Sequence, residues 1–185
     1  MQKSNLLSLD KAIKKIKISF NKISSEDVFL QDALGRCLSK PIISNVDNPK
    51  YDVSAMDGYA INYNNYTKIN KKSVKKLEVI GESSAGSPCS KKIENLETVR
   101  IFTGAKLPSG SDSVIIQEDI INSSDEKYVE TETNVIKNQF VRKKGLDFKK
   151  NQIIFKEGTI IKSRHIGSIA MTGQTWLTVS RKPVV

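Results

Sequence analysis

The sequence has only two cysteines and one histidine among its 185 residues. Cys37 and Cys89 are far apart and form no CxxC pair, so the sequence indicates neither a disulfide framework nor a zinc site. We expect both thiols to be reduced and structural. The single His165 excludes a site built from several histidines of this chain, and it falls in a segment of helical periodicity, which favours a structural role.

Long apolar runs are also absent. No stretch approaches the roughly 18 consecutive apolar residues that a transmembrane helix needs. Residues 1–10 contain no apolar core of a secretory signal. The sequence therefore predicts a cytoplasmic protein with no membrane association.

Arginine is scarce although the chain is basic. The net charge is +10, but only five of the 30 basic residues are arginines. The basic clusters at residues 71–76 and 142–144 are short and are not interleaved with aromatic residues, as a nucleic-acid stacking surface would be. Such lysines are typical of solvated faces, and we expect no nucleic-acid partner. A free-standing polyanion-binding module remains an alternative that rests on charge alone.

The two ends of the chain combine helical and strand patterns. Apolar residues recur at helical spacing over residues 9–20, with Ser8 as the N-cap, which predicts an amphipathic helix. We expect it to pack against a second helix at residues 164–171, which Ser163 caps and Gly173 ends. The other expected elements are strands at 28–30, 42–43 and 176–179, a turn or short helix at 32–36, and a hairpin of 152–155 with 159–161.

The middle of the chain, from about residue 46 to 138, has the pattern of a β-rich domain. Short apolar runs are separated by clusters of Gly, Ser, Asn and Pro at the spacing of a sandwich or barrel. The runs lie at residues 77–80, 99–102, 114–117 and 128–130, and 135–136 and 140–141 continue the set. With the two ends, this pattern predicts an α+β fold.

Residues 47–60 form the first loop that could carry chemistry. It places three carboxylates, Asp47, Asp52 and Asp57, and the hydroxyl of Ser54 among small residues, before an apolar strand. Gly58 permits a positive φ or a close approach of the backbone, and Asp57 beside it could bind magnesium or accept a proton. The competing interpretation is an Asp-Gly turn whose carboxylate bonds only its own backbone.

Residues 103–112 form a second loop, directly after an apolar strand. Its small residues, Gly104 among them, leave backbone N–H groups accessible to an oxyanion, and Thr103 adds a hydroxyl donor. The loop matches neither the P-loop nor the dinucleotide fingerprint, so a plain strand connection is the alternative. Arg142 offers a planar donor suited to phosphate or molybdate, or else is a solvated charge.

Two segments carry a resemblance to a known family. Residues 52–60 read DVSAMDGYA and residues 100–108 read RIFTGAKLP. They are similar to the DNSAMDGYA and RIMTGAPLP motifs of the MoeA and gephyrin E-domain family. The resemblance covers nearly the whole chain, with shorter matches at 33–36, 85–88, 117–118, 141–147 and 181–183.

Several positions depart from the family motifs. Val53 stands in place of Asn, Phe102 in place of Met, and Leu146 in place of Glu. Val53 removes an amide from the loop that resembles the substrate-facing one, and Leu146 removes a carboxylate next to Arg142. These changes predict altered polar contacts and an unchanged fold.

The resemblance implies a particular domain arrangement. Residues 1–45 and 139–185 would form one discontinuous, elongated α/β domain, and residues 46–138 an inserted β-rich domain that is barrel- or sandwich-like. In the family, a following domain holds adenylylated molybdopterin and most magnesium-binding acids, and homodimers place the active site between subunits. We therefore expect this chain to be a fragment that is inactive alone. A molybdopterin-adenylylating protein is a further expected partner.

The resemblance also implies a function, that of a molybdopterin molybdenumtransferase. This activity inserts molybdate into adenylyl-molybdopterin and releases AMP, with magnesium as a Lewis acid. Asp57 and Thr103 would be catalytic, with Asp57 also a metal ligand, and Ser54, Gly104 and Arg142 would bind substrate. We expect Asp57 and Thr103 to lie on neighbouring exposed loops at one end of the β-rich domain, because each adjoins an apolar strand and both belong to motifs of the same family site. The alternative is a non-catalytic dimerisation or scaffold module of a gephyrin-like protein.

Overall fold

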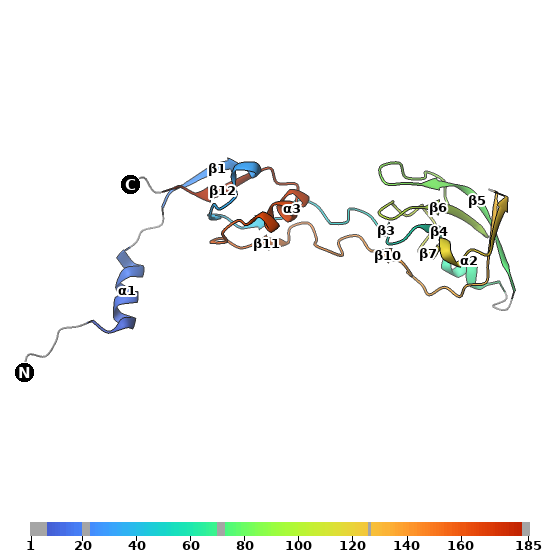
Figure 1. Ribbon diagram of the computed structural model, residues 1–185, viewed down its shortest axis with the longest axis horizontal. Helices are drawn as coiled ribbons and strands as arrows, with labels where there is room; N and C mark the ends of the chain where they lie inside the picture. Colours follow the sequence, from blue (N-terminus) through green and yellow to red (C-terminus); the bar gives the residue numbers. More distant parts are fainter. Residues whose placement is uncertain (1–6, 20–22, 70–72, 126, 183–185) are drawn as a thin grey trace, which may run out of the picture. The chain divides into compact units, whose positions relative to one another are not determined.

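The computed structural model describes residues 7–19, 23–69, 73–125 and 127–182. The chain divides into two compact units, one formed by residues 1–42 with 153–185 and the other by residues 43–152. Figure 1 shows strands from the blue and the red parts of the chain side by side in the first unit. The second domain boundary was expected between residues 138 and 139, whereas the second unit extends to residue 152. The segment after residue 138 belongs to this unit because its residue Val141 pairs with Ser54.

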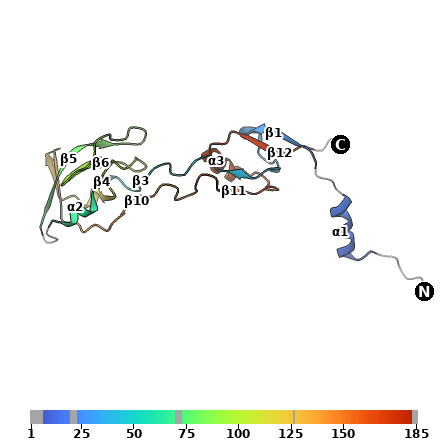
Figure 2. The ribbon, with the colours of Figure 1, turned by 180° about the vertical axis from the view of Figure 1, so that it is seen from behind.

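The first unit is held together by pairing between the two ends of the chain. Strand β1 (Ser25–Phe29) pairs antiparallel with β12 (Trp176–Ser180), and β2 (Ile42–Ile43) lies beside β11 (Ile153–Phe155). A 3₁₀ turn, η1 (Leu30–Asp32), and helix α3 (Ser163–Met171) complete the unit (Figure 2). Its core consists of Leu30, Ala33, Leu38, Ile42, Ile161, Ile169, Leu177 and Val179.

Two local expectations for this unit are wrong. Residues 152–161 form no hairpin, because β11 pairs with β2 and Ile160 forms a bridge with Cys37. The N-cap of α3 is Lys162, and Ser163 is already helical. The cap is closed by His165, whose Nδ1 accepts the Lys162 N–H at 3.3 Å. The histidine therefore has the structural role that its helical position favours.

Helix α1 (Leu9–Ser19) confirms the expected amphipathic helix, whose expected last residue, 20, lies outside the described residues. None of its residues is buried. The expected packing against residues 164–171 is therefore wrong for this chain. Its exposed apolar side chains include Leu9, Ile13, Ile16 and Ile18.

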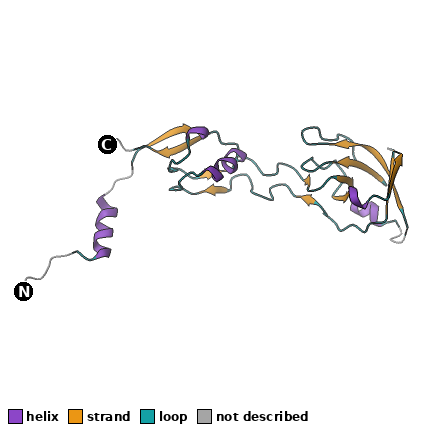
Figure 3. Cartoon of the chain, in the orientation of Figure 1, coloured by secondary structure: helices purple, strands orange, loops and turns teal. Residues whose placement is uncertain are grey.

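The second unit contains a mixed six-stranded sheet in the order β7-β4-β6-β5-β9-β8. Neighbouring strands are antiparallel except β5 and β6, which run parallel. With the helices of Figure 3, this sheet gives the chain an α+β fold; the description as a barrel or sandwich stays a prediction. The strands are β4 (Gly58–Ile61), β5 (Lys75–Ser83), β6 (Glu97–Ile101), β7 (Ser113–Ile116), β8 (Asn122–Asp125) and β9 (Tyr128–Thr131).

Short elements surround this sheet and shape its loops. Helix α2 (Tyr63–Thr67) and the 3₁₀ turn η2 (Gln117–Asp119) follow β4 and β7. Strands β3 (Val53–Ser54) and β10 (Val141–Arg142) form a separate antiparallel pair. Neither α2 nor β3 is expected from the sequence, because both are too short for a periodic pattern. In the part of the chain that the structure describes, no helix has the length and apolar character needed to cross a membrane.

Candidate functional site

The sheet of the second unit brings the two motif loops together. Asp57 immediately precedes β4, and the segment containing Thr103 follows β6. The two strands pair antiparallel with Gly58 opposite Ile101. Because antiparallel neighbours place the start of one strand beside the end of the other, both loops lie at the same edge of the sheet.

Asp57 and Thr103 are in direct contact. The backbone N–H and the hydroxyl of Thr103 each donate to Oδ1 of Asp57 at 2.7 Å. The expected proximity of these two residues is confirmed. The carboxylate bonds to a residue 46 positions away, so the purely local Asp-Gly turn does not describe it.

The same contacts lower the pKa of the Asp57 carboxyl group. The Thr103 side-chain bond lowers the pKa of Asp57 most, the Thr103 backbone bond lowers it further, and the nearby charge of Arg100 adds to the effect. Hydrogen bonds to the charged form always act in this direction. Asp57 is therefore a carboxylate at neutral pH. Both bonds end on Oδ1, so Oδ2 can accept a proton or face a cation.

Gly58 has a steric role next to this carboxylate. A Cβ at this position would lie 1.9 Å from the backbone oxygen of Ile115 on the paired strand β7. The close approach of two backbones, rather than a positive φ, requires glycine here. Gly58 therefore fixes the point at which the Asp57 loop enters the sheet.

Arg100 also belongs to this site. In the sequence it is the first residue of the motif at residues 100–108, and nothing there indicates a role for it. Its Nη2 donates to Oε1 of Gln117 at 2.6 Å, and its guanidinium lies 5.0 Å from the ring centroids of Tyr59 and Phe102. The Gln117 N–H in turn donates to the Asp57 carbonyl at 3.1 Å. Planar guanidinium groups stack and bond in this manner at fixed positions. Arg100 is therefore held beside Asp57.

Ser54 and Gly104 shape the two loops through backbone bonds. The Ser54 side chain is buried, and its hydroxyl donates to the Met56 carbonyl at 2.5 Å. The Gly104 N–H donates to the Ser54 carbonyl at 2.9 Å, so this N–H is occupied by the protein. Gly104 has a φ of +81°, which favours glycine. The expected substrate contacts of both residues stay a prediction.

Arg142 belongs to a different cluster. Its Nη2 contacts both oxygens of Asp147 at 2.7 and 2.8 Å. In the adjacent part of the loop, Asp52 accepts from the Lys143 ammonium at 2.9 Å and from the Lys144 N–H at 2.8 Å. Each of these carboxylates compensates the charge of a neighbouring basic side chain, so the basic segment is largely neutralised. An anion would have to compete with Asp147 for Arg142, and the predicted substrate contact remains untested.

The departures from the family motifs are explained in part. Val53 lies opposite Arg142 in the β3–β10 pair and forms a bridge with Lys106, contacts that need only its backbone. Phe102 provides a ring for the Arg100 guanidinium. Leu146 is exposed, and nothing in the structure explains it.

The metal ligands at this site are few. No group of three or more His, Cys, Asp or Glu side chains suited to a metal ion occurs among the described residues. Asp57 is the one acidic side chain bonded to the Thr103 loop. The contact between Asp57 and Thr103 can therefore contribute one fixed carboxylate to a cation, which needs its remaining ligands from elsewhere.

Comparisons with known proteins agree on one family. A family model described as MoeA N-terminal region (domain I and II) matches residues 7–173. A molybdopterin molybdenumtransferase from Staphylococcus epidermidis is 30% identical over the whole chain and 44% of its own length. One from Haemophilus influenzae is 34% identical over 83% of this chain and 37% of its own length.

Solved structures extend the comparison to the fold. The crystal structure of the molybdopterin biosynthesis MoeA protein from Pyrococcus horikoshii OT3 has a TM-score of 0.88 and 27% identity, covering 97% of this chain and 47% of that chain. A second structure of the Pyrococcus horikoshii protein gives 0.83 and 29%, with 97% and 45% covered. The chain thus spans less than half of the relatives that it matches.

Proposed function

The chain belongs to the MoeA N-terminal region family, and we propose that it supplies domains I and II of a molybdopterin molybdenumtransferase in molybdenum cofactor biosynthesis. The observation that carries this proposal is the contact between Asp57 and Thr103, at 2.7 Å, since each residue belongs to one of the two family motifs. A carboxylate held deprotonated at an exposed sheet edge is suited to a charged reaction partner.

The proposed reaction inserts molybdate into adenylyl-molybdopterin and releases AMP. The role of this chain is to present Asp57 as a fixed base or cation ligand, with Thr103 holding the carboxylate through two bonds to Oδ1. Preorganised charges of this kind stabilise a transition state without reorganising during the reaction. Ser54 and Gly104 shape the substrate-facing loop, and Arg142 would contact an anionic group of the substrate.

Magnesium fits this site only as a shared ion. Mg²⁺ usually keeps several waters and binds one or two carboxylates together with substrate phosphates, so the single carboxylate of Asp57 suffices for this chain's share. When bound, the ion would act as a Lewis acid towards the phosphoanhydride. The remaining ligands would come from the substrate and from the other part of the protein.

The test compares two acidic residues in the intact protein. We expect Asp57→Asn to slow molybdenum insertion by about 100-fold or more, which is the usual effect of losing one preorganised electrostatic group. Asp32→Asn, at an exposed position in η1 of the first unit, is the matched control and should change the rate little. The assay is reconstitution of a molybdoenzyme with adenylyl-molybdopterin and limiting molybdate, because excess anion would mask a lost positioning group. Insertion at the wild-type rate by a folded Asp57→Asn protein would refute the proposal.

A second candidate function is dimerisation or scaffolding without catalysis, as in a gephyrin-like module. The observation that favours it is the unburied apolar face of α1, on which Leu9 is 74% and Ile16 57% exposed. Exposed apolar patches mark interaction surfaces. Ile16→Asp would then abolish the homodimer in sedimentation experiments, and Asp57→Asn would leave both dimer and biological activity intact. Loss of insertion by Asp57→Asn in an intact dimer would exclude a purely structural role.

A further inference from the structure

Lys75 is the one lysine that the structure places in the interior among the described residues. It is 2% exposed, whereas Lys76 next to it is exposed and Leu77 is buried again. This is the alternation of a strand with one face towards a core. The side chain of Lys75 therefore points towards the core cluster that contains Tyr66 and Leu77. The expectation of a solvated basic cluster at residues 71–76 is wrong at this position.

The ammonium of Lys75 has no hydrogen-bond partner among the described residues. Its Nζ lies 4.9 Å from the centroid of the Tyr66 ring, and the charge of Asp119 acts on the same tyrosine from nearby. A buried ammonium loses its hydration, and a single cation–π contact recovers only part of that loss. Another group with negative charge is needed to stabilise the cation.

A cavity of about 160 Å³ adjoins this lysine. Its polar lining comes from Lys75, Tyr63, Tyr66, Thr67 and Asn134, so the lysine is the sole charged residue among them. Burial raises the pKa of Tyr66 to about 12, so its hydroxyl stays protonated, and it donates to the Thr133 carbonyl at 2.5 Å. The lining thus combines one cation with neutral polar groups, which suits an anion.

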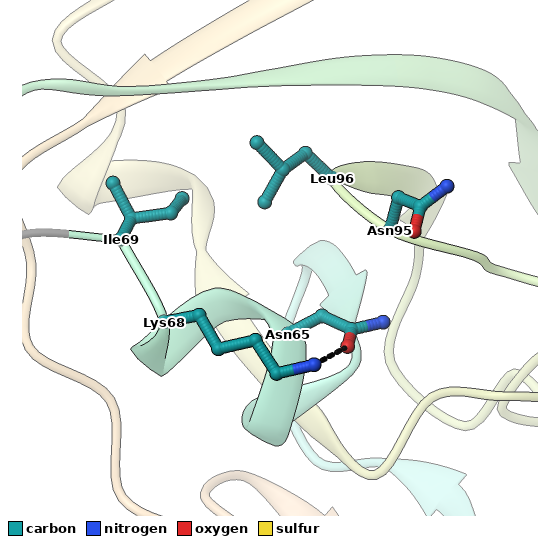
Figure 4. A pocket seen from close by; sticks show the side chains of 5 residues that line it. All are labelled: Asn65, Lys68, Ile69, Asn95 and Leu96. Atoms are coloured by element: carbon teal, nitrogen blue, oxygen red, sulfur yellow. Dashed lines mark hydrogen bonds between the residues drawn. The ribbon is translucent and has the colours of Figure 1, made fainter.

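A neighbouring pocket contains a lysine that is exposed to solvent and hydrogen-bonded. Lys68 lines a pocket of about 240 Å³ with Asn65, Ile69, Asn95 and Leu96 (Figure 4). Its side chain is exposed, and its Nζ donates to Oδ1 of Asn65 at 3.2 Å. Lys68 is hydrated and paired, so its pocket requires no ion. Burial and the missing partner distinguish Lys75 from it.

We propose that the cavity beside Lys75 binds one small inorganic oxyanion, of the phosphate, sulfate or molybdate type. The Nζ of Lys75 is covered in this structure, so the side chain turns towards the cavity when the anion binds and donates hydrogen bonds to it. The hydroxyl and amide groups of Tyr63 and Asn134 complete the surroundings of the anion. Water could fill the hydrogen bonds of the ammonium but would leave its charge uncompensated. The site is separate from the Asp57–Thr103 contact and does not depend on the proposed molybdenum transfer.

The experiment measures oxyanion-dependent stability of this chain and of two matched variants. Phosphate, sulfate and molybdate are each titrated against chloride at constant ionic strength, and the Tm gives the apparent Kd. Lys75→Met should bind at least roughly tenfold more weakly than the wild type, because the charge-assisted hydrogen bond is lost. Lys76→Met, which removes the exposed neighbouring charge, should behave like the wild type.

The outcomes separate a site from general charge effects. A Tm that rises with oxyanion in the wild type and in Lys76→Met but not in Lys75→Met supports the proposal. No rise in the wild type, or an equal rise in Lys75→Met, overturns it. Should Lys75→Met fail to fold, wild-type crystals soaked in molybdate decide: an anomalous molybdenum peak within hydrogen-bond distance of the Lys75 Nζ supports the site, and its absence overturns it.

Discussion

Two loop clusters of the second unit place their acidic side chains in opposite surroundings. The hydrogen bonds to Asp57 come from the neutral donors of Thr103, and the charge of Arg100 acts on it from nearby, whereas Asp147 is directly paired with the guanidinium of Arg142 at 2.7 Å. A carboxylate among neutral donors keeps its charge towards a ligand, and an ion pair cancels most of it. The difference teaches that of two aspartates in surface loops one can be available for chemistry and the other already neutralised. Here Asp57 is the available one.

Glycine substitutions should produce the largest difference between the two clusters. Gly58→Ala places a Cβ 1.9 Å from a backbone oxygen, and we expect it to destabilise the chain by about 3 kcal/mol, since two paired strands must separate. Gly145→Ala, in the basic cluster, meets the flexible Cγ of Lys149 at 3.1 Å and a φ of +70°. We expect about 1 kcal/mol there, the usual cost of a left-handed backbone. Urea unfolding measures both.

The order of the two effects is the informative result. Equal losses would show that β4 can shift away from β7 without cost, and that the Asp57 loop is not fixed by the sheet.

Sequence patterns predicted that Asp57 and Thr103 lie on neighbouring loops, because both residues adjoin apolar strands and belong to family motifs; their direct hydrogen bonds come from the structure. The same reasoning missed Arg100, whose position depends on Gln117, a partner from another strand end. Local turn residues suggested a hairpin at 152–161, but the partner of that strand comes from residues 42–43. Long-range pairing is not visible in periodicity.

Lys75 shows a second limit of prediction from sequence. Its neighbours include other lysines, so composition favours a solvated cluster, whereas its position on β5 buries it. Strand register decides which of two adjacent lysines faces the core, and a shift of one residue would reverse the result. The burial of Lys75 therefore follows from tertiary structure alone.

The second prediction concerns the pKa of Asp57 in two variants of Thr103. Thr103→Val keeps the backbone N–H bond but removes the hydroxyl, the largest cause of the lowered pKa, so the pKa of Asp57 should rise towards its ordinary value of 3.8. Thr103→Ser is the control, because it retains a hydroxyl donor and should stay near the wild type. Carboxyl carbon NMR titrations measure the three values. An unchanged pKa in Thr103→Val would mean that the hydroxyl does not hold the carboxylate.

The lowered pKa of Asp57 also determines how the stability of the folded chain depends on pH. The pKa of Asp57 is lower in the folded chain than in the unfolded one, so its contribution to stability is present above about pH 3.8 and is lost as the pH falls through the folded value. Thr103→Val should therefore lose stability relative to the wild type at neutral pH and match it in strong acid. A difference that grows in acid would contradict this assignment.

The smallest expected effect concerns the ion pair of the basic cluster. A double-mutant cycle with Arg142→Ala and Asp147→Ala should give a coupling of about 0.5 kcal/mol at low salt, because exposed pairs gain little beyond the entropy they lose. The two side chains are 46% and 40% exposed, so added salt should reduce the coupling further. The pair of Lys143 and Asp52, with 46% and 37% exposure, is the matched control cycle and should give a similar value. A weak coupling is also what a substrate role for Arg142 requires, because an incoming anion must displace Asp147 at low cost. A coupling several times larger than that of the control pair would instead show Arg142 to be fixed by Asp147, and would remove it from the residues that can bind substrate.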